Sequence, residues 1–359
     1  MFPAEIYLPI YLLIVTIFTF LTLSKYKPFV FFRKNKLSQV PKAVSLSIFF
    51  TIFLGFRPVS TIFGDTGSYD EVYQVIMGNR FYLNLNVPNF IFENIFNFFA
   101  SQNISINYFF LLISTIYFSC TLWACMILFP KDSLLSFIMY LGAFSTYSYG
   151  VNGIKAGAAA ALFLLAIAYR RKKAIALIFL FLSYGFHHSM LAPNTAFIIS
   201  YYYKNPKTYL YGWFFCLLLA ALHITVFMSL FAGYTDDHGA AYLRSSSQNI
   251  VSGFRPDFIL YSAIPIILGY YIITTKRYVS ENYIFIWQVY TLTNCVFLLC
   301  TYGSFINRIA YLSWLLYPFV LLYPFIYGKW GNQQCTYIKN IVYGHLCFTL
   351  FMQLFYYQL

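Results

Sequence analysis

The sequence has few charged residues. Asp, Glu, Lys and Arg make up 9% of its 359 residues, whereas a soluble domain carries roughly 25%. Hydrophobic residues make up 60%, and apolar runs recur along the whole length with short polar breaks between them. No polar stretch is long enough for a separate soluble domain. The composition therefore predicts an integral membrane protein with a single transmembrane domain, residues 1–359.

Patterns that would indicate a metal, a nucleotide or a disulfide framework are also missing. None of the 7 cysteines belongs to a C-x-x-C pair, so we interpret them as packing residues. The sequence contains no H-E-x-x-H, P-loop, G-x-S-x-G or Rossmann pattern. The net charge of +13 does not indicate nucleic acid, because Lys and Arg lie at the ends of apolar segments. We expect no metal, no cofactor and no nucleic-acid partner.

The apolar segments predict an all-α, polytopic fold. About 20 apolar residues cross the hydrocarbon layer as a helix, and about twelve such segments can be counted. The first has no basic n-region and no small-residue cleavage site, so we expect it to be retained rather than removed as a signal peptide. The segments lie near 5–24, 43–56, 107–129, 133–150, 153–169, 174–187, 188–203, 208–232, 257–275, 282–302, 306–327 and 341–357.

The charges orient these segments. With the N-terminus outside, 17 of the 23 basic residues fall in cytoplasmic loops, in agreement with the positive-inside rule. Eight of the 10 acidic residues fall outside. Two larger external (periplasmic) loops result, 57–106 and 233–256. In the first, residues 88–99 have apolar side chains at helical spacing from Phe92, which predicts an amphipathic helix on the outer leaflet.

A few basic residues remain on the outer side, and four of them lie at the boundary of apolar segments. Each alone could reach the lipid headgroups, but four at one membrane face favour a shared anionic ligand. A planar guanidinium suits phosphate because it meets two oxygens at once. Lys155 also lies near a helix N-terminus, where the dipole favours an anion. The four are Arg57, Lys155, Arg255 and Arg308.

Residues that could accept a proton are expected at the same level. Asp65, in the turn that follows Arg57, could be a general base, could position a sugar hydroxyl or could only cap a turn. His187 and His188 end a helix on the outer side, and a neutral imidazole can accept a proton near neutral pH. Adjacent helical residues point about 100° apart, so we expect only one of the two to face the site, and either can be that one.

In this order the motifs resemble the EpsG/Wzy-type family of bacterial polysaccharide polymerases. Arg57 with residues 65–69 (DTGSY) resembles the family's Arg and Asp-Thr-x-x-Tyr signal. Glu93 resembles the Glu of the amphipathic stretch that follows. Residues 154–158 (IKAGA) resemble the Arg-Gln-x-x-Ala helix start, but here Lys155 replaces Arg and Ala replaces Gln. Lys acts as a point charge and lacks the bidentate fork of Arg.

Two further elements extend the resemblance to roughly residues 50–330. Residues 186–189 (FHHS) resemble the family's Phe-His-x-Ser helix break, and either His fits it. Residues 307–311 (NRIAY) resemble its late Arg before a Tyr-rich span. The resemblance implies a metal-independent glycosyltransferase of the bacterial inner membrane that acts on the periplasmic face. It would move a growing O-antigen, capsule or exopolysaccharide glycan from undecaprenyl diphosphate to an incoming lipid-linked unit.

The resemblance and the residues together predict three groups of site residues and their partners. Expected partners are undecaprenyl-diphosphate-linked oligosaccharides and membrane lipid, with a chain-length regulator protein as a further candidate. Arg308 is expected both to bind the diphosphate and to stabilise the leaving charge. The groups are catalytic residues His188, His187, Asp65 and Arg308; diphosphate-binding residues Arg57, Lys155, Arg255 and Arg308; and sugar-binding residues Tyr69, Glu93 and Arg244.

Two other functions share some of these features. An O-antigen ligase uses the same donor and the same His and Arg chemistry but transfers glycan to lipid A or protein. A lipid-oligosaccharide flippase would have charges at mid-membrane depth and two repeated halves. The cations here cluster at one end of the segments and the halves share no pattern, so the sequence favours the polymerase.

Overall fold

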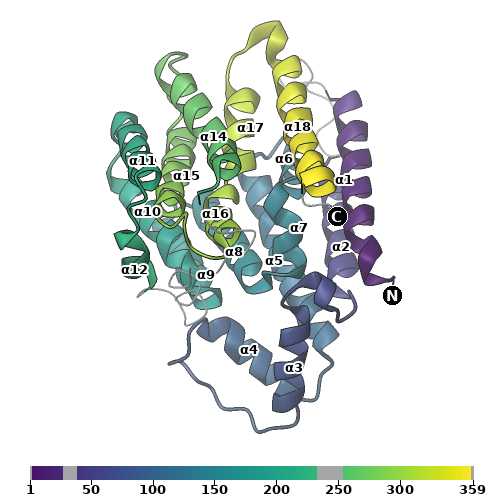
Figure 1. Ribbon diagram of the computed structural model, residues 1–359. Helices are drawn as coiled ribbons and strands as arrows, with labels where there is room; N and C mark the ends of the chain where they lie inside the picture. The colour runs from purple at the N-terminus through teal and green to yellow at the C-terminus, as the bar shows by residue number, and fades with distance from the viewer. Residues whose placement is uncertain (1, 27–38, 233–253, 357–359) are drawn as a thin grey trace. The chain divides into compact units, whose positions relative to one another are not determined.

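The computed structural model describes residues 2–26, 39–232 and 254–356. They form helices joined by short connections, with no strand in these three ranges (Figure 1). The all-α prediction is therefore confirmed. The chain divides into two compact units, residues 1–187 with 329–359, and residues 188–328. The assignment of one transmembrane domain stays a prediction.

The first unit is built around α5 (Ile106–Leu128), which packs against α2 (Gln39–Gly55) and α8 (Ile154–Ala168). Its other helices are α1 (Tyr7–Ser24), α3 (Thr66–Ile76), α4 (Phe90–Ser101), α6 (Ser133–Leu141), α7 (Phe144–Val151), α9 (Lys173–Phe186) and α18 (Gln334–Phe351), with a π-helix at Met352–Tyr356. Within this unit, α3 and α4 lie beyond one end of the long helices, at the end where the N-terminus lies (Figure 1).

The second unit is built around α15, which packs against α10, α11, α14, α16 and α17. A buried polar chain joins three of these helices: Trp213 Nε1 donates to Asn294 Oδ1 at 2.8 Å, and Asn294 Nδ2 donates to Ser313 Oγ at 3.0 Å. The helices are α10 (Leu191–Tyr202), α11 (Pro206–Ala221), α12 (Val226–Ala232), α14 (Pro256–Thr274), α15 (Glu281–Leu299), α16 (Ile306–Trp314) and α17 (Tyr317–Tyr327).

Each of the twelve predicted segments overlaps a helix or a pair of helices. Among the described residues, 4 helical segments are long and apolar enough to cross a membrane, or up to 5 if the bent pair α6–α7 counts as one. The protein is thus a polytopic all-α membrane protein, while the count of twelve stays a prediction. The 4 segments are Ala4–Ser24, Ile106–Leu128, Pro256–Thr274 and Ile306–Tyr327.

Two of the segments predicted as single spans are broken helices. The segment 133–150 bends by 74° between α6 and α7, where Ala143 is extended (φ −77°, ψ 141°). The segment 208–232 is interrupted between α11 and α12, where His223 has a left-handed φ of 58°. Both predictions of one continuous helix were wrong, because hydropathy does not register a local change of backbone conformation.

The break between α6 and α7 leaves carbonyl groups without helical partners, and neutral hydroxyl groups satisfy them. A carbonyl inside a membrane protein has no bulk water to bond with, so an irregular backbone there needs protein donors. Three side chains supply them: Thr146 Oγ1 donates to Tyr140 O at 2.6 Å, Tyr11 OH to Leu141 O at 2.6 Å and Thr349 Oγ1 to Gly142 O at 2.8 Å.

The predicted amphipathic helix exists as α4, but its apolar face meets protein. Phe92 and Phe96 are 1% and 2% exposed. Their ring centroids lie 5.2 and 5.1 Å from that of Phe109 on α5. Tyr73 of α3 packs on Phe96 from another direction, at 5.1 Å. The expected placement of this face in the outer leaflet is therefore wrong, because α3 and α5 cover it.

Candidate functional site

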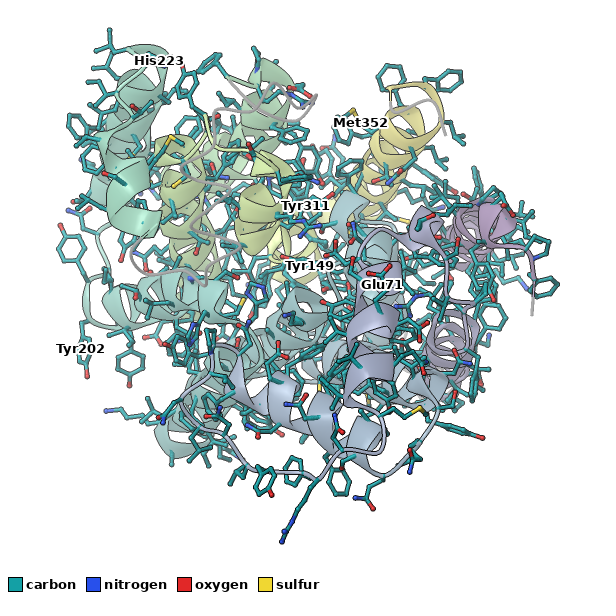
Figure 2. All side chains as sticks on the ribbon, turned by 60° about the horizontal axis from the view of Figure 1, so that its bottom comes forward. Glu71, Tyr149, Tyr202, His223, Tyr311 and Met352 are labelled. Carbon is teal, nitrogen blue, oxygen red and sulfur yellow. The ribbon has the colours of Figure 1, made fainter. Side chains whose placement is uncertain are left out.

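Several of the sequence motifs meet at the short break between α7 and α8. The helix α7 ends at Val151, and Asn152 and Gly153 separate it from α8. The segment that follows α2 docks on this break, and α3 and α4 pack beside each other. In Figure 2, α3 and α4 lie toward the viewer, with Glu71 of α3 and Tyr149 of α7 labelled. The break is therefore the candidate site of the first unit.

Arg57 is the buried cation of this site. Its side chain is 0% exposed. Nη1 donates to Leu54 O at 2.8 Å, and Nη2 donates to Val151 O at 3.1 Å and to Thr66 Oγ1 at 3.4 Å. The guanidinium carbon lies 4.4 Å from the ring centroid of Phe110. Arg57 thus joins the end of α2, the start of α3 and the end of α7.

Among the described residues, no acid neutralises the charge of Arg57. No carboxylate of the described residues lies within ion-pair distance of it, and its Nε has no hydrogen-bond partner among them. Burial lowers the pKa of Arg57 to about 10, which still leaves the side chain protonated at neutral pH. A ligand cannot touch it in this conformation, so its predicted contact with a diphosphate would need the side chain to be uncovered. The geometry favours a positioning role.

The turn around Asp65 is fixed by Asn152. The backbone N–H of Asp65 donates to Asn152 Oδ1 at 3.1 Å, and Thr66 Oγ1 donates to Val151 O at 3.1 Å. Gly64 has a φ of 64°, and a Cβ there would lie 2.5 Å from Asn152 Oδ1. Glycine is therefore required on both counts. The Asp65 carboxylate is half-buried and makes no capping hydrogen bond to α3, so the interpretation as a simple cap does not account for it.

Lys155 and Glu93 form an ion pair. Lys155 is the second residue of α8, and its Nζ lies 2.9 Å from Glu93 Oε1. The Lys155 side chain is 21% exposed and the Glu93 side chain is 30% exposed. The Lys155 ammonium also lies 5.3 Å from the ring centroid of Phe92 and 5.8 Å from that of Tyr69. The anion expected at the start of this helix is thus supplied by the protein itself.

Close packing of α4 against α9 holds Glu93 in place. A Cβ on Gly185 of α9 would lie 2.5 Å from Ile91 Cδ1 and 3.0 Å from Phe90 Cζ, so a larger residue there would require these side chains of α4 to shift. The hydroxyl of Ser183, also on α9, donates to Ala159 O of α8 at 2.8 Å. The helix α9 therefore links the helix that carries Glu93 to the helix that carries Lys155.

The two histidines differ in backbone conformation. His187 follows the last residue of α9 and is extended, with φ −153° and ψ 121°. His188 begins a short 3-10 helix, His188–Met190, and belongs to the second unit. Both are half-buried. The helical spacing of about 100° that we expected does not apply, because the helix ends before the pair.

The cations of the second unit have different surroundings. Arg255 is 9% exposed and pairs with Asp257 through Nε at 2.9 Å and Nη2 at 2.5 Å. Arg308 is half-buried in the first turn of α16, 5.3 Å from the ring centroid of Phe305. Phe305 has a φ of 53°, a left-handed conformation that costs about 1–2 kcal/mol. Arg244 lies outside the described residues.

Asn152 is the residue that the prediction missed. The sequence does contain a signal for it, because the Asn-Gly pair at 152–153 between two apolar stretches is typical of a turn. The partners of the turn lie far away in sequence, as Asp65 is 87 positions from Asn152. No single-sequence pattern indicates such a pairing.

The arrangement offers a carboxylate, an ammonium and an aromatic ring at a partly exposed position, with a buried guanidinium that fixes the neighbouring turn. No group of three or more His, Cys, Asp or Glu residues in the described part of the chain could hold a metal ion. Carboxylates and ammonium groups bind hydroxyl groups, and carboxylates and imidazoles also accept protons. Such a set suits the binding and transfer of sugars.

One of the comparisons with known proteins found a match. The model of the EpsG family matches residues 42–359. This range includes every candidate site residue named above. No curated protein matches the chain, and no solved structure does either.

Proposed function

Because this chain belongs to the EpsG family, a family of the polysaccharide-polymerase type, we propose that it polymerises undecaprenyl-diphosphate-linked repeat units. It would do so in the bacterial inner membrane, with about twelve crossings and with the break between α7 and α8 on the periplasmic side. The observation that carries the proposal is the convergence of Arg57, Thr66, Glu93 and Lys155 on that break, since these are the positions of the family resemblance.

The proposed reaction is a glycosyl transfer without a metal. A hydroxyl oxygen on the terminal sugar of the incoming unit attacks the anomeric carbon of the growing glycan. The bond from that carbon to the carrier's diphosphate breaks, and the diphosphate leaves with the bonding electrons. The hydroxyl proton passes to His188, His187 or Asp65. A preorganised cation stabilises the negative charge on the leaving diphosphate.

Arg308 is the strongest candidate for that cation. It is half-buried rather than sealed, whereas Arg57 is 0% exposed and Arg255 already holds Asp257. A guanidinium fork matches two diphosphate oxygens. Arg255 would bind the diphosphate only by exchanging its carboxylate partner for the ligand. Tyr69 and Glu93, with Arg244, are proposed to contact sugar.

Replacing Arg308 by Ala tests the proposal. We expect loss of long polymer and accumulation of single lipid-linked units, because the leaving charge is no longer stabilised. An effect on the order of 100-fold on rate is typical of one lost electrostatic donor. Polymer length is measured by gel electrophoresis of extracted glycan, and the purified protein is assayed on lipid-linked units with and without EDTA. Lys276→Ala, at an exposed position, is the control.

The same assay separates the alternatives. A ligase variant would still build polymer on undecaprenyl, and a flippase would form no polymer from purified lipid-linked units. A normal ladder from Arg308→Ala at wild-type protein level contradicts the proposed role of Arg308. Failure of the purified wild-type protein to extend lipid-linked units would count against the polymerase itself. Activity that EDTA abolishes would contradict metal independence.

A further inference from the structure

We infer that Lys155 and Glu93 act together as a subsite for a neutral sugar, and that Lys155 does not bind the diphosphate. The inference deepens the proposed function and rests on it. It starts from the ion pair at 2.9 Å between Lys155 Nζ and Glu93 Oε1. With that partner in place, the pair has no net charge to offer an anion.

The charge balance disfavours a diphosphate at this position. A diphosphate near Lys155 would also approach the Glu93 carboxylate, and like charges a few ångströms apart repel each other. To bind, it would have to displace Glu93, which lies on a helix tightly packed against α9 through Gly185 and Ile91. The ammonium also lies near the rings of Phe92 and Tyr69, and neither ring can take over the role of the carboxylate.

A sugar hydroxyl suits the same pair. It can donate its proton to the carboxylate and accept a hydrogen bond from the ammonium, and the ion pair stays intact. Both side chains retain exposure, 21% for Lys155 and 30% for Glu93. Tyr69 is half-buried against Phe92 and Phe96, so its position is fixed next to the pair. A sugar is amphipathic, and a fixed aromatic ring beside charged hydrogen-bonding groups complements both its apolar and its polar parts.

The Lys at this position also agrees with the inference. A diphosphate site gains from the bidentate fork of Arg, whereas a single hydroxyl needs only one donor. The flexible stem of Lys155 reaches Glu93 across 62 positions of sequence, and the compact ammonium lies beside the rings of Phe92 and Tyr69. The chemical class of ligand is thus a hydroxyl-bearing, uncharged sugar of the lipid-linked unit.

The test compares two probes on the full-length protein in lipid nanodiscs. One probe is undecaprenyl diphosphate without sugar, and the other is the lipid-linked repeat unit extracted from cells that lack the polymerase. We expect Glu93→Gln and Lys155→Gln each to weaken binding of the sugar-bearing probe about tenfold, the typical effect of one charge-assisted hydrogen bond. Affinity for the sugar-free probe should stay within about twofold of wild type.

Matched controls lie on the same external segment. Glu71→Gln removes an exposed carboxylate from α3, and Arg80→Gln removes an exposed cation from the following loop. Neither should alter the binding of either probe. The exchanged pair, Glu93→Lys with Lys155→Glu, restores an ion pair of opposite polarity. We expect it to recover the thermal midpoint but not the sugar-dependent affinity, whereas a purely structural pair would recover both.

Several results would overturn the inference. Tighter binding of the sugar-free probe by Glu93→Gln would mean that Lys155, once released, holds the diphosphate. Equal weakening of both probes, or no change in either, would also contradict it. If the wild-type protein extends lipid-linked units and the Glu93→Gln variant binds them normally, the proposed subsite is wrong but the proposed function is not. Wild-type protein that neither binds nor extends them refutes the proposed function.

Discussion

The two ends of α7 show two ways of stabilising a helix break inside a membrane protein. At its start, three carbonyls accept hydrogen bonds from the hydroxyls of Tyr11, Thr146 and Thr349. At its end, the carbonyl of Val151 accepts from the guanidinium of Arg57 and from Thr66. Neutral hydroxyls would suffice for hydrogen bonding at either end. A buried charge costs much more, so hydrogen bonding alone does not explain its presence at this end.

The largest expected effect comes from removing the charge. Arg57→Ala removes the guanidinium donor from the carbonyls of Leu54 and Val151, leaves Val151 O with Thr66 as its donor, and loosens the turn around Asp65. Charge-assisted hydrogen bonds contribute about 1.5–3 kcal/mol each, so we expect a loss of unfolding free energy on the order of 3 kcal/mol and loss of long polymer. The checks are the thermal midpoint of the purified protein and the glycan ladder.

Arg57→Lys sharpens this expectation. It keeps the charge but cannot reach both carbonyls, because Lys lacks the planar fork. An intermediate thermal midpoint with partial polymer supports positioning by geometry. If Lys restores polymer fully, the charge alone matters and the positioning role is wrong.

A medium effect is expected from Gly157→Ala. The added Cβ would lie 2.5 Å from the carbonyl oxygen of Tyr149, so α8 must move away from α7 and carry Lys155 with it. Overpacking of this kind costs about 1–3 kcal/mol. We expect a lower thermal midpoint and shorter polymer. Gly344→Ala on α18 is the control, because nothing lies within 4 Å of its Cβ; it should leave the polymer ladder normal and should not lower the thermal midpoint.

The smallest effect should come from the other end of α7. Thr349→Val removes the hydroxyl that donates to Gly142 O and leaves that carbonyl unpaired, at a cost of about 1 kcal/mol. The thermal midpoint should fall slightly while the polymer ladder stays normal. If Thr349→Val shortens the glycan polymer at unchanged protein level, the two helix breaks do not differ in their effect on polymerisation and the comparison is wrong.

The sequence indicated a set of candidate site residues, whose roles stay predictions, but it did not indicate how they are arranged. Hydropathy located the helices, and the order of Arg57, Asp65, Glu93 and Lys155 agreed with the family. It could not show that Glu93 pairs with Lys155, because 62 positions separate them and helical spacing carries no information across that distance. Nor could it show that Arg57 is sealed, since burial depends on Phe110 and Val151 from other helices.

The bond from Arg57 to Val151 also constrains how the protein is made. The two residues are 94 positions apart, and a ribosome adds about 5–20 residues per second. Roughly 5–20 s therefore pass between the synthesis of Arg57 and the synthesis of Val151, whose carbonyl accepts its hydrogen bond. During that time Arg57 must remain in water or at the headgroups. The turn that carries Asp65 consequently adopts its final shape only after α7 has been synthesised.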